Sequence, residues 1–151
     1  MFSLPDTSRV WIYKADRFLT DDEAQGIQQK VDEFIPTWAA HGKKLYAEAK
    51  VIDNLWIVIA ADESREGASG CSIDKIFRLV ADLEKEYACS FTNRLILAYQ
   101  SEGQIKLAPL TQIKELGINA DTLIYDDTVQ NLGDFKNRLK PAIQTWLKRS
   151  L

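Results

Sequence analysis

The chain has 151 residues, of which 46% are hydrophobic and 27% charged, and its formal net charge is −3. This length and apolar content are enough for one domain with a single core, and they exclude disordered, collagen-like and low-complexity chains. The weak negative charge argues against a general nucleic-acid coat or a membrane-surface binder, because both need a basic surface.

Strand-like and helix-like patterns alternate at the start of the chain. Arg9–Tyr13 is mostly β-branched or aromatic and predicts a first strand. Thr20 and Glu23 have the spacing of a capping box, and the apolar residues after them recur at helical intervals. We therefore expect a helix that ends or kinks at Pro36, with Gly42 as the left-handed residue that stops it.

Two further strands and a second helix are expected next. Leu45–Ile52 predicts a second strand, and Asp53–Asn54 is typical of a two-residue turn. Leu55–Ala61 is apolar at every position, which predicts a central strand covered on both faces. After a polar loop, apolar residues at helical spacing predict a helix that begins near Ser72, and Leu95–Tyr99 predicts a fourth strand.

Shorter elements are expected in the C-terminal third. Ile105–Ala108 predicts a fifth strand, Thr111–Leu116 a small helix and Thr122–Tyr125 a further strand. A last helix is expected over Asp134–Ser150, disturbed at Pro141.

The element order predicts the fold class. The pattern β-α-β-β-α-β over about residues 9–100 is typical of a ferredoxin-like α+β core, within a single domain covering residues 1–151. Alternation along the first and third strands puts a second apolar set on the face away from the helices: Trp11, Tyr13, Trp56 and Val58. Because this face is too apolar to lie in water, we expect a C-terminal β/α extension to cover it, with a second subunit as the alternative.

Strand directions in this fold bring distant loops to one end of the sheet. The loop that leaves the first helix at His41, the acidic pair Asp62 and Glu63, and Cys71 at the start of the second helix should all lie at that end. The turn at Ser101–Gly103 should reach it too.

Cys71 is the candidate nucleophile of this end of the sheet. It lies at or just before a helix N-terminus, where unpaired amides and the helix dipole stabilise a thiolate. In a catalytic interpretation His41 is its base, and Asp62 or Glu63 orients the imidazole. The residues assigned to ligand binding flank the cysteine: Ser69, Gly70 and Ser72.

A structural interpretation of the same residues is favoured. Ser69 or Ser72 would cap the helix with Cys71 as a small packed residue, and His41 would complement a helix C-terminus. Cys71 and Cys89 bracket the second helix and lie too far apart for a disulfide. No paired ligand motif such as Cys-x-x-Cys is present, so no metal or cofactor is expected.

Three stretches carry a family resemblance: Trp38-Ala39-Ala40-His41-Gly42, Asp62-Glu63 and Ser69-Gly70-Cys71-Ser72-Ile73-Asp74. They resemble a family of short uncharacterised bacterial proteins, and the similarity runs from Arg9 to Trp146. Members of that family are sometimes labelled ABC transporter ATPases. This chain has no Gly-x-x-x-x-Gly-Lys-Ser/Thr run, so the label does not describe it. The resemblance implies a bacterial cytoplasmic protein and transfers no catalytic residue.

Location and function are expected as follows. The start of the chain shows no secretory signal, and Leu55–Ala61 is far shorter than the roughly 18–20 residues that cross a bilayer, so we expect a cytoplasmic protein. We expect a non-catalytic module that binds an unknown small molecule or protein at the His41/Cys71 end, without nucleic acid or membrane. The alternatives are a thiol-dependent enzyme that uses Cys71 and a structural subunit of a homodimer.

Overall fold

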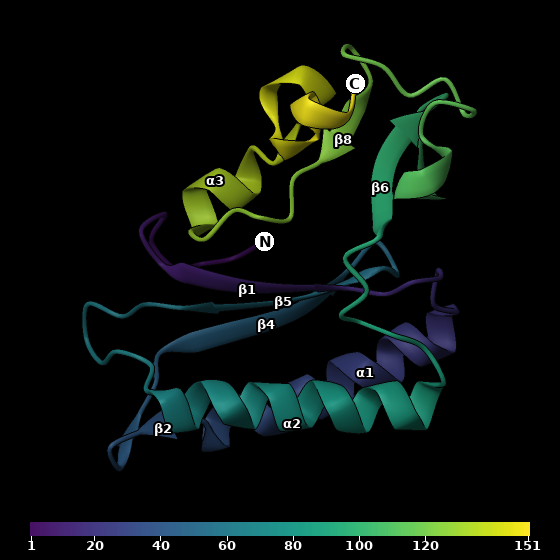
Figure 1. Cartoon of the computed structure of the whole chain (residues 1–151). Coiled ribbons are helices and arrows are strands. Elements are labelled where there is room, and N and C mark those ends of the chain that lie inside the picture. Colours follow the sequence, from purple (N-terminus) through teal and green to yellow (C-terminus); the bar gives the residue numbers. More distant parts are fainter.

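Two antiparallel sheets organise the chain, and the computed structural model describes all residues, 1–151 (Figure 1). The first sheet has the order β1-β5-β4: β1 is Arg9–Lys14, β4 is Ala47–Ile52 and β5 is Trp56–Ala61. The second sheet has the order β7-β6-β8-β9: β6 is Ile96–Ser101, β7 Gln104–Pro109, β8 Leu123–Tyr125 and β9 Leu139–Pro141. A small hairpin joins β2 (Ala39–Ala40) to β3 (Lys43–Lys44). The chain is therefore an α+β protein, as predicted.

Two long helices cover one face of the first sheet, and local sequence signals explain both starts (Figure 1). Helix α1 (Asp21–Phe34) begins with the predicted capping box, in which Glu23 N–H donates to Thr20 Oγ1 at 3.1 Å. Helix α2 (Gly70–Tyr87) begins slightly earlier than predicted, after the N-cap Ser69. No helix combines the length and the apolar content that a membrane span requires.

The central strand of the first sheet is β5, as its sequence predicts. Every residue of Trp56–Ala61 is buried, because β1 and β4 flank the strand and both of its faces are covered. The predicted turn before it is confirmed, since Asp53 and Asn54 both have φ of +53°, the left-handed conformation of a two-residue hairpin turn.

The first helix ends just before Pro36, as predicted, but the predicted role of Gly42 in stopping it is wrong. A 3-10 turn, η1 (Ile35–Thr37), follows α1 and contains Pro36. Gly42, with φ of +76°, does not stop the helix but lies with His41 in the turn between β2 and β3. The prediction that His41 complements a helix C-terminus was therefore wrong.

A ferredoxin-like core is not confirmed, because β6 leaves the first sheet. The first three strands keep the predicted order, but the fourth pairs with β7 over its full length and with β8 at Tyr99 and Ile124. The turn Ser101–Gly103, with positive φ at Glu102 and Gly103, makes this local pairing possible. Strand β1 consequently remains at the edge of the first sheet.

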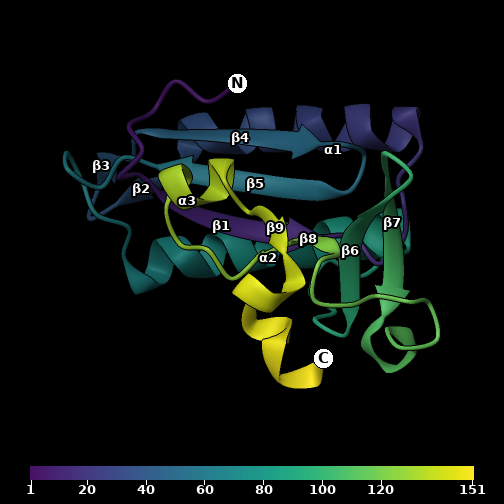
Figure 2. The ribbon, with the colours of Figure 1, turned by 90° about the horizontal axis from the view of Figure 1, so that it is seen from above.

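The C-terminal third covers the second face of the first sheet, as predicted (Figure 2). The Trp56 and Tyr125 rings lie 4.8 Å apart, and Leu132 and Phe135 join the same core. The prediction that Trp11 and Tyr13 lie on the sheet face away from the helices was wrong. Both rings point toward the helices, because the register pairs these residues with Ile59 and Ile57.

The predicted last helix is also wrong. The segment forms a short helix, a strand and two 3-10 turns: α3 (Leu132–Lys136), β9, η3 (Ala142–Gln144) and η4 (Trp146–Ser150). Residues Leu139–Pro141 pair with β8. Their backbone groups therefore make the hydrogen bonds of a sheet and are not available for a helix. In place of the predicted small helix there is a 3-10 turn, η2 (Leu110–Gln112). These elements bury a second, smaller core: Leu97, Tyr99, Ala108, Ile113, Ile118, Ile124, Ala142 and Leu147.

Candidate functional site

The predicted end of the first sheet does gather three of its expected segments. The β2–β3 hairpin, the loop after β5 and the start of α2 lie together (Figure 1). The indole Nε1 of Trp38 donates to Ser72 O at 2.8 Å and fixes the hairpin against the first turn of α2. The turn Ser101–Gly103 does not reach this end, because it joins β6 to β7 in the second sheet.

His41 and Cys71 are not joined in a catalytic pair. Both residues are exposed, and neither side chain makes a hydrogen bond or an ion pair within the chain. Cys71 and Cys89 are both free thiols, as predicted. The predicted packing of Cys71 as a small buried residue is wrong, because the cysteine is the second residue of α2 and its side chain is exposed to solvent.

The acidic pair closes the loop between β5 and α2. Asp62 Oδ1 accepts from the backbone N–H of Ser64 at 3.1 Å and from its hydroxyl at 2.6 Å. These hydrogen bonds from Ser64 lower the pKa of Asp62. Glu63 Oε2 accepts from Ala68 N–H at 2.8 Å, and Arg9 lies 3.9 Å from its other oxygen. Neither carboxylate orients His41.

The serines assigned to ligand binding cap the helix. Ser72 N–H donates to Ser69 Oγ at 3.1 Å, and Ser69 N–H donates to Ser72 Oγ at 2.6 Å. Gly70 is the first residue of α2, with no atom within 4 Å of the position that a Cβ would take. No group of three or more His, Cys, Asp or Glu side chains is placed to hold a metal ion. The local contacts at this end are those of a cap and a loop.

A groove of about 790 Å³ lies along the outer edge of β1, between α2 and the C-terminal third. We call it the β1 groove and define it by its lining residues: 10–14, Phe77, 91–94, 96–97, 125, 127–130 and Trp146. Most of these residues are hydrophobic. The groove exists because β6, the predicted neighbour of β1, lies in the other sheet.

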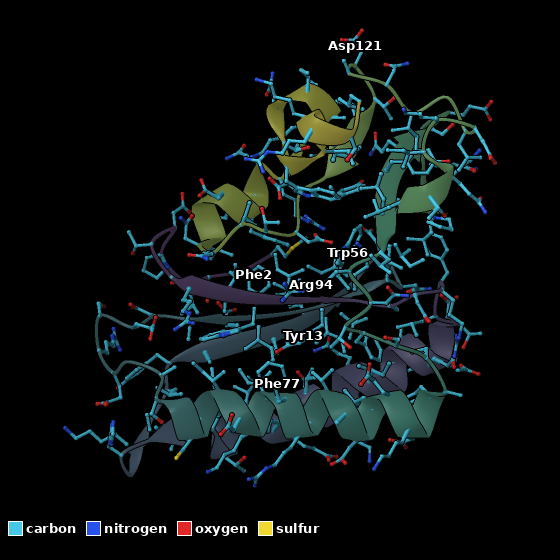
Figure 3. The ribbon with its side chains drawn as sticks, viewed as in Figure 1. Phe2, Tyr13, Trp56, Phe77, Arg94 and Asp121 are labelled. Carbon is cyan, nitrogen blue, oxygen red and sulfur yellow. The ribbon has the colours of Figure 1, made fainter.

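Aromatic rings line the β1 groove from β1, from α2 and from the C-terminal third. The Tyr13 and Phe77 rings meet edge to face with centroids 6.5 Å apart, and burial raises the pKa of Tyr13. Phe77 is 55% exposed and Trp146 is 42% exposed, so both present apolar surface to the groove. Figure 3 shows Phe77 below Tyr13, with Arg94 above it. The groove therefore offers aromatic contacts from both sides.

One of the two cations in the β1 groove has no partner. Lys14 Nζ lies 3.4 Å from Asp127 Oδ2, so the charges of this pair offset each other. Arg94 is exposed and makes no ion pair or side-chain hydrogen bond within the chain. The free charge of the groove is therefore positive, although the whole chain carries −3.

The outer backbone edge of β1 is partly unpaired. Residues of an antiparallel strand direct their N–H and C=O groups alternately to the two sides. On the outer side Val10 N–H donates to Gln130 O at 3.0 Å, and beyond the strand Asp16 N–H donates to Ser90 O at 2.9 Å. Between these two bonds, the outward groups of Ile12 and Lys14 have no backbone or side-chain partner.

A buried arginine holds the C-terminal third against the first sheet. The Arg138 guanidinium lies over the Trp56 ring at 4.6 Å and the Phe135 ring at 4.2 Å, and its Nε is 3.5 Å from Asp127 Oδ1. Burial lowers the pKa of Arg138, while Asp127 opposes this effect. Sequence patterns gave Arg94 no role and placed Arg138 in a basic cluster on a solvated helix face, because each gains its role through contacts between distant segments.

Comparisons with protein-family models, with curated proteins and with solved structures gave no match to this chain. The resemblance to the bacterial family therefore stays a prediction.

Proposed function

We propose that this protein is a non-catalytic binding module whose site is the β1 groove. The observation that carries the proposal is the pair of half-exposed rings, Phe77 from α2 and Trp146 from η4, which both line an apolar groove of about 790 Å³. Large aromatic side chains left open to water in a concave site are typical of ligand and partner binding. The proposal keeps the binding function expected from the sequence but moves it away from the His41/Cys71 end.

The two alternative functions have less support. A thiol-dependent enzyme would need a base beside Cys71, and His41 makes no bond to it. A structural homodimer was expected to cover Trp56, which the chain's own C-terminal third already buries. A bacterial origin, a cytoplasmic location and a ferredoxin-like core stay predictions.

The proposal is tested with a small aromatic probe, N-acetyltryptophanamide, titrated into the ¹⁵N-labelled protein. Because one ring buries little surface, we expect a dissociation constant on the order of 1 mM or weaker. The largest changes in amide chemical shift should occur at residues 12–14, Phe77, 92–94 and Trp146. Shifts spread evenly over the surface, or none in the groove, would contradict the proposal.

A matched pair of variants distinguishes binding in the groove from nonspecific binding to any exposed aromatic ring. Phe77→Ser removes a ring that is 55% exposed inside the groove, whereas Phe18→Ser removes a ring that is 43% exposed outside it. We expect Phe77→Ser to weaken the probe about threefold or more and Phe18→Ser to leave it unchanged. Equal effects of the two variants would count against the groove.

A further inference from the structure

We propose that the occupant of the β1 groove is an extended peptide segment of a partner protein, which adds as a strand to β1 and places an acidic side chain near Arg94. This inference rests on the proposed function and names the chemistry of the partner. It is carried by the juxtaposition of three features: an unpaired backbone edge, aromatic walls on both sides of it, and one cation without a partner.

The backbone edge is the first of these features. The outward N–H and C=O groups of Ile12 and Lys14 face the groove and have no partner in the chain. Such groups are a template for a further strand, because a peptide in extended conformation presents complementary donors and acceptors at the same spacing. This is the side on which the predicted fourth strand would have paired with β1. The bonds of Val10 and Asp16 at either end limit the added strand to a few residues.

The shape of the groove favours a single strand over a second copy of the chain. Helix α2 and the C-terminal 3-10 turns both project beyond β1 on its open side, as Figures 1 and 2 show together. Paired strands lie about 4.8 Å apart. Two copies of this recessed edge could not approach so closely, because α2 and the C-terminal turns of each copy would meet first. An isolated extended segment meets no such obstacle.

The walls specify the side chains of the partner strand. Alternate residues of an added strand would point toward Phe77 and Tyr13 on one side and toward Trp146 and Val129 on the other. Both sets would meet apolar surface. Since Lys14 is already paired with Asp127, Arg94 is the cation left for the partner, and an Asp or Glu side chain complements it.

The test begins with selection from a phage-displayed library of random octapeptides against the whole protein. We expect the selected peptides to carry an acidic residue between apolar ones and to shift the amides of Ile12 and Lys14. The best peptide is then synthesised in three forms: unchanged, with its acidic residue replaced by lysine, and N-methylated at alternate residues. N-methylation keeps the side chains but removes backbone donors, so we expect about tenfold weaker binding when it falls on the residues that face β1.

A matched pair of protein variants tests the charge. Arg94→Glu should weaken the acidic peptide about tenfold and restore binding to its lysine form. Arg78→Glu, an exposed α2 residue outside the groove lining, should change neither.

The outcomes separate this inference from the proposed function. If the peptide binds in the groove but tolerates both N-methylation and Arg94→Glu, strand addition is wrong and the groove proposal stands. If no peptide is selected while N-acetyltryptophanamide still binds, the occupant is not a peptide. If neither binds, both proposals are wrong. A dimer in sedimentation that Ile12→Pro dissociates would show a second copy as the occupant.

Discussion

Trp56 donates its indole N–H to Asp127 Oδ2 at 2.9 Å, and this bond ties the central strand of the first sheet to the loop after β8. Lys14 and Arg138 approach the same carboxylate at 3.4 and 3.5 Å. Asp127 therefore joins the edge strand, the central strand and the C-terminal third, and it lies in the lining of the β1 groove.

Removing this carboxylate should destabilise the fold. In Asp127→Ala, Arg138 loses its only acidic partner while it stays buried, so we expect a loss of about 3 kcal/mol in the free energy of unfolding. The control is Asp121→Ala, at an exposed residue far from the groove (Figure 3), for which we expect a change within about 0.5 kcal/mol. Urea denaturation measures both, and equal midpoints would contradict the role assigned to Asp127.

Features set by neighbouring residues could be predicted from the sequence. The cap formed by Thr20 and Glu23 and the turn at Asp53–Asn54 depend on a few adjacent residues. The central position of β5 follows from its unbroken apolar composition. The meeting of the hairpin, the acidic loop and the start of α2 at one end was predicted from the antiparallel order of the first three strands, which the structure keeps.

Features set by pairing between distant segments could not be predicted in this way. Because side chains alternate along a strand, Trp11 and Ile12 must lie on opposite faces of the sheet. Only the register with β5 decides which of them faces the helices. The pairing of Leu139–Pro141 with β8 overrides a helical pattern in the same residues. The β1 groove was missed for this reason, since it follows from the departure of β6.

Stability in acid should depend on Glu23. The Arg17 guanidinium donates two hydrogen bonds to this carboxylate, at 2.8 and 2.9 Å, and with the backbone bond from Thr20 they lower the pKa of Glu23 from 4.5 to about 2. A lowered pKa in the folded state means that the stabilisation is complete above the ordinary pKa and is lost as the pH falls toward the folded value.

Glu23→Gln should therefore flatten the change in stability between about pH 4.5 and 2, measured by urea denaturation at each pH. Glu33→Gln, at an exposed residue of the same helix without a side-chain bond, is the control and should leave the profile unchanged. A Glu23→Gln profile that overlays the unmodified protein would show that the Arg17 contact contributes nothing in solution.

The two cysteines should react at different rates. Cys71 is exposed, whereas Cys89 is partly buried, and burial raises the pKa of Cys89 and so lowers its thiolate fraction near neutral pH. Iodoacetamide should therefore alkylate Cys71 first, as followed by mass spectrometry. Because His41 makes no bond to Cys71, His41→Ala should change the Cys71 rate by less than about twofold. A fall of tenfold or more would favour the thiol-enzyme alternative.

Two glycines at the Cys71 end should respond oppositely to alanine. Gly42 and Gly70 both have open space where a Cβ would be added, so packing does not distinguish them. Gly42 holds φ of +76° in the β2–β3 turn, a conformation that costs an alanine about 1 kcal/mol, so Gly42→Ala should lower the free energy of unfolding by that amount. Gly70 starts α2 without a positive φ, so Gly70→Ala should raise the free energy of unfolding by about 0.5 kcal/mol through the loss of unfolded-chain entropy. Thermal unfolding of the two variants side by side measures the difference, and a Gly42→Ala variant no less stable than the unmodified protein would mean that the hairpin turn does not hold Gly42 in its left-handed conformation.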